Sequence, residues 1–508
     1  MSEVRQIYYR GSLKFCNYSC SYCPFSKGKR SERQLEQDEK ELFRFVELLQ
    51  EKEFRGAVQI VPYGEALIHK YYWEALAKLS KLPNIEAVGA QSNFSFPVSQ
   101  MLQVFEQAGG QKEKLRLWGT FHPEMVSVEK FLSQCQTLQR EEVLFCVGAV
   151  GVPKEASLLQ TLRRELDSSV YMWINKMDGL GRNYTEEEKK TFCEIDEYFE
   201  LELRHHKANP QRCGSATLID AKGDMYSCNL CRQKIGNIYA KDFEDLLNAE
   251  RICKRKECDC YISYSNRKDM EELVFFHPYP AFRIPFYRRA VFFDVDGTLV
   301  FEGEKEINER RATWLRRLAG HSNIYLATSL PFEDAMKKVR PVADVICGGV
   351  FAGGGRLRWK EQAETKECFF PLEVKWLKRA EELQKEFGFR IRKYTRKNVI
   401  YKVVFSFFSE QILEEEQQLL ENELWGGNLD FHIVKEENKW EITAKETGKL
   451  AGIRHICEMK GMTLREVAVF GNSEADLEMM KAVSFSVAAK GSSEQVKKAA
   501  TIHVEGML

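Results

Sequence analysis

Apolar, strand-like segments alternate with amphipathic, helix-like segments along most of this chain, and this alternation limits the possible folds more than any other feature. The first six strand-like segments are QIYYRGSL, AVQIVPY, IEAVGAQSN, LRLWGTFH, VLFCVGAVGV and VYMWINKM. Neighbouring parallel strands need a long crossover connection, which a helix normally supplies. The pattern therefore predicts an α/β fold whose first sheet is parallel, either open or barrel-like.

A change in the residue pattern divides the chain into domains. Between about residues 205 and 270 the strand-like segments are short and the cysteines dense, and the following VFFHPYPAFRIPFYRR contains three prolines. After it, AVFFDVDGTLV begins a second α/β pattern, as expected for 508 residues, which exceed one ordinary core. The predicted parts are a first domain at 1–204, a cysteine-rich domain at 205–270, a linker at 271–287, and a second α/β domain at 288–508 with a core of about 288–365 and 440–508 and an inserted α+β cap of about 366–439.

The formal net charge is +0, so no general attraction to nucleic acid or to an anionic membrane is expected. No run of 18 apolar residues occurs, and the first residues, MSEVRQIYYRGS, lack the apolar stretch of a signal peptide. We therefore expect a cytoplasmic protein with no membrane or nucleic-acid partner. In that reducing compartment, clusters among the 15 cysteines indicate metal binding rather than disulfides.

The first cysteine cluster follows the first strand-like segment. Cys16, Cys20 and Cys23 have the spacing C-x3-C-x2-C. Thiolates favour iron–sulfur clusters, zinc and copper. Three thiolates cannot fill the four corners of a [4Fe–4S] cluster, so one iron would stay open to bind a substrate or a cofactor. A zinc site with a fourth ligand elsewhere in the chain is the alternative.

Residues 5 to 200 resemble the radical S-adenosylmethionine (SAM) superfamily. The stretch CNYSCSYC matches the cluster motif of that family, with Tyr22 as the aromatic residue before the last cysteine. The family's Gly-Gly-Glu motif corresponds to Tyr63-Gly64-Glu65, in which tyrosine replaces the first glycine. At the end of the third strand-like segment, polar residues stand where the family often contacts SAM. The SAM contacts that the resemblance implies are Gly64, Glu65, Ser92 and Asn93.

The same resemblance implies a partial (β/α)6 barrel with a [4Fe–4S] cluster on Cys16, Cys20 and Cys23. A reductant such as flavodoxin or ferredoxin would supply the electron that cleaves SAM, and the resulting radical would abstract hydrogen from a substrate. Reacting groups of such barrels lie at the carboxyl ends of the strands. The substrate-contact candidates at those ends are Thr120, His122, Glu124, Asn175 and Lys176.

A second cysteine cluster follows a predicted hairpin. CGSATLIDAKGDMYSC, from Cys213 to Cys228, reads as two strands that turn at Lys222-Gly223. Together with the later cysteines, this segment resembles the SPASM or twitch extension of radical SAM enzymes, which binds an auxiliary [4Fe–4S] cluster. The ligands that we expect are Cys213, Cys228, Cys258 and Cys260, with Cys253 or Cys231 as substitutes. A zinc ribbon is the alternative.

A third candidate site begins with two carboxylates. Asp294 and Asp296 end the apolar strand in VFFDVDGTLV, where they could share Mg²⁺ while one attacks phosphorus. Thr328 ends a second strand in IYLATSLP, and Lys449 begins a helix in TGKLAGIRHI. Asn472 and Asp476 follow a third strand in VAVFGNSEADLEMM.

Residues 289 to 508 resemble the haloacid-dehalogenase (HAD) superfamily, whose four motifs occur here in order. VAAKGSSEQVKKAATIHV is similar to the tail of its Cof-like, type IIB branch, which inserts a large cap into a Rossmann-like core. The resemblance implies that Asp294 is the nucleophile and that Asp296 protonates the leaving oxygen and then activates water. Thr328 and Lys449 would bind the phosphoryl group. The implied Mg²⁺ ligands are Asp294, Asp296, Asn472 and Asp476, of which Asn472 replaces the aspartate of many relatives and is expected to weaken the site.

The three sites together predict a bifunctional enzyme. Radical SAM chemistry on a phosphorylated small molecule, such as a sugar or a nucleotide, would be coupled to Mg²⁺-dependent hydrolysis of a phosphate monoester. The alternative is a peptide- or protein-modifying radical SAM/SPASM maturase with an accessory HAD phosphatase. Only 15 residues precede Cys16, so we expect no appended peptide-recognition domain, which speaks against this alternative.

Overall fold

The computed structural model describes residues 5–25, 31–52, 54–207, 216–230, 233–248, 253, 255–265, 267, 270–361, 364–408, 414–426, 430–436 and 438–504. The chain divides into two compact units, Met1–Phe286 and Tyr287–Leu508. Each unit is described by itself below. None of the helices in the described ranges combines the length and the hydropathy that a membrane crossing requires.

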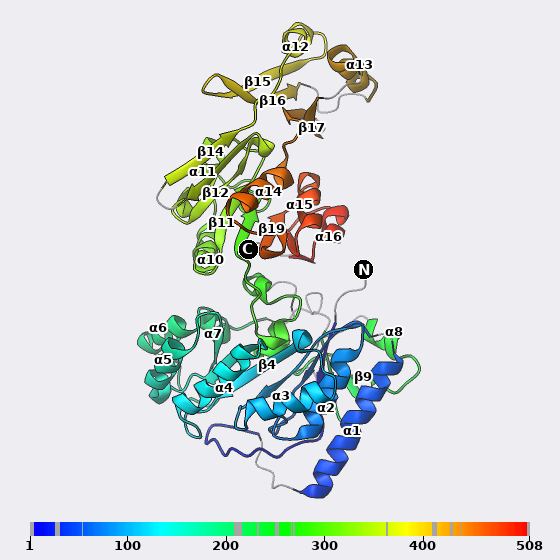
Figure 1. The fold of residues 1–508 in the computed structure, drawn as a ribbon, viewed down its shortest axis with the longest axis vertical. Helices are drawn as coiled ribbons and strands as arrows, with labels where there is room; N and C mark the ends of the chain where they lie inside the picture. The colour runs from blue at the N-terminus through cyan, green and yellow to red at the C-terminus, as the bar shows by residue number, and fades with distance from the viewer. Residues whose placement is uncertain are drawn as a thin grey trace. The chain divides into compact units, whose positions relative to one another are not determined.

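The first unit is built on six parallel strands that lie side by side in chain order (Figure 1). Each of the six strand-like segments predicted from the sequence overlaps one of them, although β1 and β2 each begin one residue earlier than predicted. The strands are β1 (Arg5–Tyr9), β2 (Gly56–Ile60), β3 (Ile85–Ser92), β4 (Leu115–Phe121), β5 (Leu144–Val150) and β6 (Met172–Asn175). The helices that alternate with them or follow β6 are α1 (Glu32–Glu51), α2 (Lys70–Lys81), α3 (Val98–Gln107), α4 (Val128–Arg140), α5 (Ala156–Glu165), α6 (Glu186–Ile195) and α7 (Phe199–Leu203).

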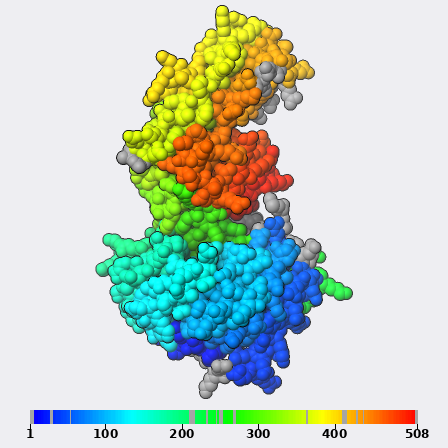
Figure 2. Space-filling view, in the orientation of Figure 1, coloured from blue at the N-terminus to red at the C-terminus, as the bar shows by residue number. Residues whose placement is uncertain are grey.

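The helices cover one face of this sheet, which we call the outer face. In α1, Leu42, Phe45, Val46 and Leu49 recur at helical spacing and are buried against it. They share one apolar core with strand residues such as Val58. In the space-filling view, the side chains of α1 to α4 (blue to cyan) form a continuous layer (Figure 2). The sequence therefore forms these helices because each has an apolar stripe that the sheet can bury.

The opposite, inner face of the sheet is covered by the end of the first unit. Small strand residues such as Ala57 and Ala87 leave room there, and Phe282 packs on Gly89, where a β-carbon would lie 2.9 Å from its ring. The covering segment contains the short 3-10 helices η4 (Glu271–Phe276) and η5 (Pro280–Phe282). Residues 271–286, expected as a linker, thus form part of the core of the first unit.

Short strands extend the first sheet beyond β1. β7 (Ala216–Ile219) runs parallel to β1, and β8 (Asp224–Tyr226) and β9 (Lys234–Asn237) add antiparallel. Gly223 turns the β7–β8 hairpin with a positive φ of 83°, which glycine adopts without a steric penalty. The short helices α8 (Phe243–Asn248) and α9 (Tyr261–Tyr264) follow. The predicted hairpin turn therefore lies at the expected glycine.

The second unit has a core sheet in the order β14-β13-β12-β11-β10-β19-β20-β21. Strands β11, β10, β19 and β20 are parallel, and the chain crosses from β10 to β11 on one side and reaches β19 on the other. Ligands of open α/β sheets bind at the carboxyl edge where the strand order reverses in this way. The strands are β10 (Ala290–Phe293), β11 (Asn323–Ala327), β12 (Ile346–Phe351), β13 (Arg356–Glu361), β14 (Glu364–Phe369), β19 (Val467–Gly471), β20 (Phe485–Ala488) and β21 (Ile502–His503). The helices are α10 (Glu309–Ala319), α11 (Phe332–Lys338), α14 (Lys449–Met459), α15 (Leu477–Ala482) and α16 (Glu494–Ala499).

A smaller cap sheet is inserted between β14 and α14. It has the antiparallel order β15-β16-β18-β17, and helices α12 and α13 cover one of its faces. Its elements are α12 (Leu377–Leu383), β15 (Phe389–Arg396), β16 (Val399–Phe407), α13 (Glu414–Trp425), β17 (Phe431–Glu436) and β18 (Lys439–Ala444). The boundaries differ from those expected at 366 and 439, because β14 pairs with β13 in the core sheet and β18 pairs with β16 in the cap sheet.

Candidate functional site

The three cysteines of the first motif lie in the loop between β1 and α1. Cys20 is buried, whereas Cys16 and Cys23 are half-buried. Burial raises the pKa of Cys16, and it raises the pKa of Cys20 to about 11. The thiols of Cys16 and Cys20 therefore hold their protons near neutral pH unless a cation stabilises the thiolates, which is how metal binding at cysteines normally proceeds.

The loop that follows β4 contacts this cysteine loop. The backbone nitrogen and the hydroxyl of Ser21 donate to the carboxylate of Glu124 at 2.7 and 2.6 Å. The hydroxyl of Tyr22 lies 2.8 Å from Nδ1 of His122. Burial lowers the pKa of His122 to about 4, so its ring is neutral near pH 7. His122 and Glu124, expected to contact substrate, thus contact the loop between Cys20 and Cys23.

The expected SAM contacts lie together at the ends of β2 and β3. Glu65 is buried and accepts hydrogen bonds from the Ser92 hydroxyl and the Asn93 backbone nitrogen, both at 2.7 Å. Burial raises the pKa of Glu65 to about 7 against the effect of these hydrogen bonds. A β-carbon at Gly64 would lie 2.0 Å from the backbone oxygen of Phe15, so only glycine fits beside the cysteine loop.

Asn93 connects this group to the cysteine loop. Its side-chain nitrogen lies 3.0 Å from Oδ1 of Asn17 and 3.8 Å from Sγ of Cys16. The structure therefore brings the first cysteine motif and the four expected SAM contacts to the same edge of the sheet. Of the other substrate-contact candidates, Asn175 accepts a hydrogen bond from Arg283, and the backbone nitrogen of Lys176 lies 3.3 Å from Glu202.

The second cysteine cluster is described in part. Cys213 and Cys231 lie outside the described residues. Burial raises the pKa of Cys258, Arg267 opposes this shift, and the nearby thiols of Cys253 and Cys228 add to it. The side-chain nitrogen of Asn229, next to Cys228, lies 3.3 Å from Sγ of Cys260. The structure thus places cysteines from the hairpin and from the later segment close to one another.

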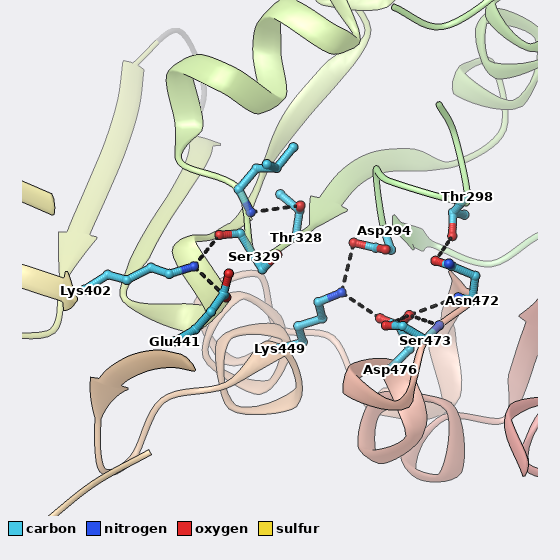
Figure 3. A network of polar contacts seen from close by, with 11 residues as sticks. Asp294, Thr298, Thr328, Ser329, Lys402, Glu441, Lys449, Asn472, Ser473 and Asp476 are labelled. Atoms are coloured by element: carbon cyan, nitrogen blue, oxygen red, sulfur yellow. Dashed lines mark hydrogen bonds and ion pairs between the residues drawn. The ribbon is translucent and has the colours of Figure 1, made fainter. Parts of the chain in front are cut away.

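The third site gathers at the carboxyl edge of the core sheet in the second unit (Figure 3). Asp294 follows β10, Thr328 follows β11, Asn472 follows β19, and Lys449 is the first residue of α14. Parallel strands that end at one edge bring these side chains together although they are far apart in the sequence. All four expected motifs therefore meet.

Lys449 lies between two buried carboxylates. Its Nζ is 2.9 Å from Oδ1 of Asp294 and 2.7 Å from Oδ1 of Asp476. Burial raises the pKa of Asp294 to about 7, and the ammonium group of Lys449 opposes this shift. The two carboxylates raise the pKa of Lys449 above its ordinary value in spite of its burial. Lys449 is therefore charged and fixed beside the expected nucleophile.

Asp476 is fully occupied by hydrogen bonds. Its Oδ2 accepts from the backbone nitrogens of Asn472 and Ser473, at 2.9 and 3.0 Å, and from the Ser473 hydroxyl at 3.1 Å. Since Oδ1 contacts Lys449, both oxygens have partners. Asp476 thus orients Lys449 and the loop after β19.

The side chain of Asn472 lies beside two further oxygens. In one amide orientation its oxygen accepts from the Thr298 hydroxyl at 3.0 Å. That position is also 2.9 Å from the backbone oxygen of Asp296 and 3.2 Å from Oδ2 of Asp294, and the rotated amide would donate to all three. Oxygens bound to one octahedral Mg²⁺ at 2.0–2.1 Å lie about 2.9 Å apart. A carboxylate, a backbone carbonyl and an amide oxygen at this spacing therefore fit Mg²⁺.

The carboxylate of Asp296 points to a different partner. Its Oδ1 lies 2.6 Å from Nζ of Lys338, the last residue of α11, and its side chain is 51% exposed. Asp296 is therefore more accessible than Asp294, as a group that exchanges protons with a substrate or with water must be.

The comparisons with known proteins address the second unit. Residues 371–505 match the family model of haloacid dehalogenase-like hydrolases. The C-terminal part of the chain is a HAD-like hydrolase domain. The expected motifs before residue 371 lie outside that match, but Asp294 and Thr328 lie in the same site as Lys449 and Asp476, which the match includes.

Two curated relatives of this hydrolase domain are phosphoglycolate phosphatases. The protein from Methanosarcina acetivorans is 28% identical over 130 residues, which are 25% of this chain and 55% of the relative. The protein from Archaeoglobus fulgidus is 22% identical over 219 residues, 43% of this chain and 90% of the relative. The chain thus spans only about half the length of the first relative. A solved HAD-like hydrolase from Bacteroides thetaiotaomicron is 20% identical, with a TM-score of 0.37, over 43% of this chain and 93% of its own.

One cap residue of the HAD-like hydrolase domain, Lys402, contacts the core beside Thr328, and a second, Glu441, forms an ion pair with it. Neither residue was expected from the sequence. Nζ of Lys402 donates to the backbone oxygen of Ser329 at 2.6 Å and lies 2.7 Å from Glu441 (Figure 3). The contact of Lys338 with Asp296 was not expected from the sequence either. No local motif marks these residues, because their partners are distant in sequence and the contacts depend on the tertiary fold.

Proposed function

We propose that the HAD-like hydrolase domain hydrolyses a phosphate monoester with the help of Mg²⁺. The observation that carries this proposal is the position of the Asp294 carboxylate. Its Oδ1 contacts Lys449, and its Oδ2 lies beside the side-chain amide of Asn472, which is also close to the backbone oxygen of Asp296. Mg²⁺ bound by Asp294, the Asp296 backbone oxygen and Asn472 would neutralise charge on the transferring phosphoryl group. An amide ligand in place of a carboxylate would make this site weaker than that of relatives with aspartate.

The reaction that we propose has two steps. A carboxylate oxygen of Asp294 attacks phosphorus, the ester P–O bond breaks, and Asp296 gives a proton to the leaving oxygen. Asp296 then removes a proton from a water molecule that attacks the aspartyl-phosphate, which releases inorganic phosphate and restores Asp294. Thr328 and Lys449 bind phosphoryl oxygens throughout.

The substrate that we propose is a small phosphate ester. Both curated relatives carry the name phosphoglycolate phosphatase, which supports a small anionic leaving group. A sugar or nucleotide phosphate belongs to the same chemical class. The identity of the ester is best sought by screening phosphate monoesters with the full chain.

We further propose that the first unit is a radical SAM enzyme. Supporting this proposal are the C-x3-C-x2-C loop at the carboxyl edge of six parallel strands and its contact with Asn93. Cys16, Cys20 and Cys23 would hold a [4Fe–4S] cluster, and Gly64, Glu65, Ser92 and Asn93 would orient SAM. Bound together, these cofactors would supply a 5′-deoxyadenosyl radical for hydrogen abstraction, with the electron coming from a flavodoxin- or ferredoxin-like reductant.

We also propose a twitch-like auxiliary [4Fe–4S] cluster next to the partial (β/α)6 barrel. The proximity of Cys228 and Cys253 to Cys258, and of Asn229 to Cys260, supports it. Cys213, Cys228, Cys258 and Cys260 remain the ligands that we favour, with Cys253 or Cys231 as substitutes.

One pair of assays tests both activities in the same preparation. Anaerobically reconstituted protein should cleave SAM, and this activity should disappear when Cys16, Cys20 and Cys23 are replaced by alanine. Mg²⁺-dependent phosphate release should disappear in Asp294→Asn and persist in the cysteine variant. If reconstituted protein binds no iron at these cysteines, the radical SAM proposal is wrong and the phosphatase proposal is unaffected.

A further inference from the structure

Arg283 is a buried cation on the inner face of the first sheet. Only 2% of the residue is exposed, and it follows η5 in the segment that covers this face. Its guanidinium carbon lies 3.7 Å from the ring centroid of Tyr261, 3.8 Å from that of Trp118 and 4.5 Å from that of Trp173. Its Nη1 donates to Oδ1 of Asn175, the last residue of β6, at 2.8 Å. The side chain therefore reaches the carboxyl edge of the sheet, where the proposed radical chemistry would take place.

No carboxylate within the described residues forms an ion pair with this guanidinium. Two other buried cations of the chain do have such partners: Lys402 contacts Glu441, and Arg356, with a side chain 3% exposed, contacts Glu333 and Glu367. Burial of a charge without a counter-ion is costly, because the charged group loses its hydration and gains no opposite charge in return. Arg283 thus lacks, within the described residues, the kind of ion pair that Lys402 and Arg356 form.

The aromatic rings compensate only part of this cost. A cation–π contact offers the quadrupole of a ring rather than an opposite charge, and the amide of Asn175 offers only a dipole. Moreover, Nε of Arg283 and the indole nitrogens of Trp118 and Trp173 are buried and have no hydrogen-bond partner among the described residues. The guanidinium and the two tryptophans that it contacts thus contain three N–H donors that still lack an acceptor there.

The backbone of Arg283 also indicates a binding site. Its φ of 53° and ψ of 30° lie in the left-handed region, which a residue with a β-carbon seldom adopts. Such strain persists only where the surrounding structure enforces it, and it is commonest at binding sites.

We propose that Arg283, with the indole N–H groups of Trp118 and Trp173, binds an oxyanion of the radical-reaction substrate, and that this oxyanion is a phosphate monoester. An oxyanion satisfies both the charge and the orphan donors, and arginine suits phosphate because its planar fork can donate two parallel hydrogen bonds. A carboxylate offers similar chemistry. Phosphate is favoured because the same chain carries a hydrolase domain whose proposed substrate is a phosphate ester. The inference rests on the proposed function of both units.

Equilibrium dialysis of the full chain with radiolabelled inorganic phosphate tests this site, because the hydrolase site provides an internal reference. Wild-type protein should bind two phosphates per chain, and Arg283→Gln should bind one. Phosphate inhibition of p-nitrophenyl phosphate hydrolysis should be unchanged in Arg283→Gln. The matched control is Arg163→Gln, which should still bind two phosphates, because Arg163 donates to the backbone oxygens of Val170, Leu166 and Asp167 and lies away from the inner face.

A second variant guards against misfolding. Asn175→Asp places a carboxylate beside the guanidinium, so it should raise the melting temperature of the first unit while lowering phosphate affinity at this site at least tenfold. Acetate in place of phosphate distinguishes a carboxylate site from a phosphate site. Equal phosphate binding by wild type and Arg283→Gln overturns the inference, as does tighter binding of acetate than of phosphate.

The failure of this inference is distinguishable from failure of the proposed function. Phosphate binding at Arg283 needs neither iron nor SAM, so it is measured on protein without cluster. SAM cleavage without a second phosphate site would overturn only the inference. A second phosphate site without iron binding would overturn only the radical SAM proposal.

Discussion

The ammonium group of Lys402 donates a 2.6 Å hydrogen bond to the backbone oxygen of Ser329, which joins the base of the cap to the loop that holds Thr328. Lys402 is 1% exposed, and its other partner, Glu441, is 6% exposed. The ammonium of Lys402 holds the pKa of Glu441 below its usual value in spite of burial, and Lys439 adds to this effect. A buried lysine, whose ion pair with Glu441 lies within the cap, therefore joins the cap to the core loop that holds Thr328.

Replacing Lys402 by methionine should destabilise the hydrolase domain by about 2–4 kcal/mol, because Glu441 would keep only one of its lysine partners. We expect a lower urea concentration for half-loss of phosphatase activity and a raised KM for p-nitrophenyl phosphate. The double variant Lys402→Met/Glu441→Leu should recover part of the stability, since no buried charge is left unpaired. An unchanged midpoint in Lys402→Met would show that the pair does not hold the cap.

Asp294→Asn should lower Mg²⁺-dependent phosphate release by several orders of magnitude, because the amide cannot attack phosphorus.

Asn472→Asp tests the proposed Mg²⁺ ligands. It restores a carboxylate beside Asp294, so the Mg²⁺ concentration for half-maximal activity should fall severalfold. Titration of Mg²⁺ in the wild type and in Asn472→Asp checks this. A higher Mg²⁺ concentration for half-maximal activity in the variant would contradict the ligand assignment.

Glu124→Gln should reduce the iron retained by reconstituted protein, because the carboxylate holds both the backbone nitrogen and the hydroxyl of Ser21 between two cysteines. Loss of a hydrogen bond that orients a metal-binding loop commonly lowers metal affinity about 10–100-fold. Glu129→Gln is the control, since Glu129 is exposed in the first turn of α4. Iron analysis after gel filtration measures the effect, and equal iron in both variants would exclude a role for this contact.

The second cysteine cluster predicts an iron count. If both sets bind [4Fe–4S] clusters, reconstituted protein should hold about eight irons per chain, and Cys228→Ala/Cys258→Ala should hold about four. SAM cleavage by the first cluster should remain measurable. Stoichiometric zinc in protein purified without oxygen would instead identify a zinc ribbon.

The first unit should lose stability as pH rises from about 4 to 7. Burial raises the pKa of Asp196 to about 7, although the backbone nitrogens of Ile174 and Tyr198 oppose this shift by donating to it. A carboxyl group with a raised folded pKa stabilises the protein at low pH, and that contribution is lost as pH passes through the folded pKa. Asp196→Asn should flatten this dependence in melting curves recorded from pH 4 to 8. An equal slope in both proteins would assign the dependence to another group.

Much of the architecture was predictable because it depends on local patterns. Periodic apolar residues mark the strands and helices, and the cysteine and aspartate motifs mark the sites. The position of β18 was not predictable, because Trp440 and Ile442 alternate equally well into a core sheet or a cap sheet and only pairing with β16 decides. Contacts such as Lys402 with Ser329, or Arg283 with Trp118, join residues that have no sequence relation and exist only in the folded chain.

The inner face of the first sheet depends on residues that follow the cysteine-rich region. A gene truncated after residue 270 would lose η5 and Phe282, and the apolar surface around Ala57, Ala87 and Trp118 would be exposed to water. Recombination that joined this unit to another partner would therefore have had to carry the chain as far as Phe286. A stand-alone homologue of the first unit should therefore retain the segment up to Phe286.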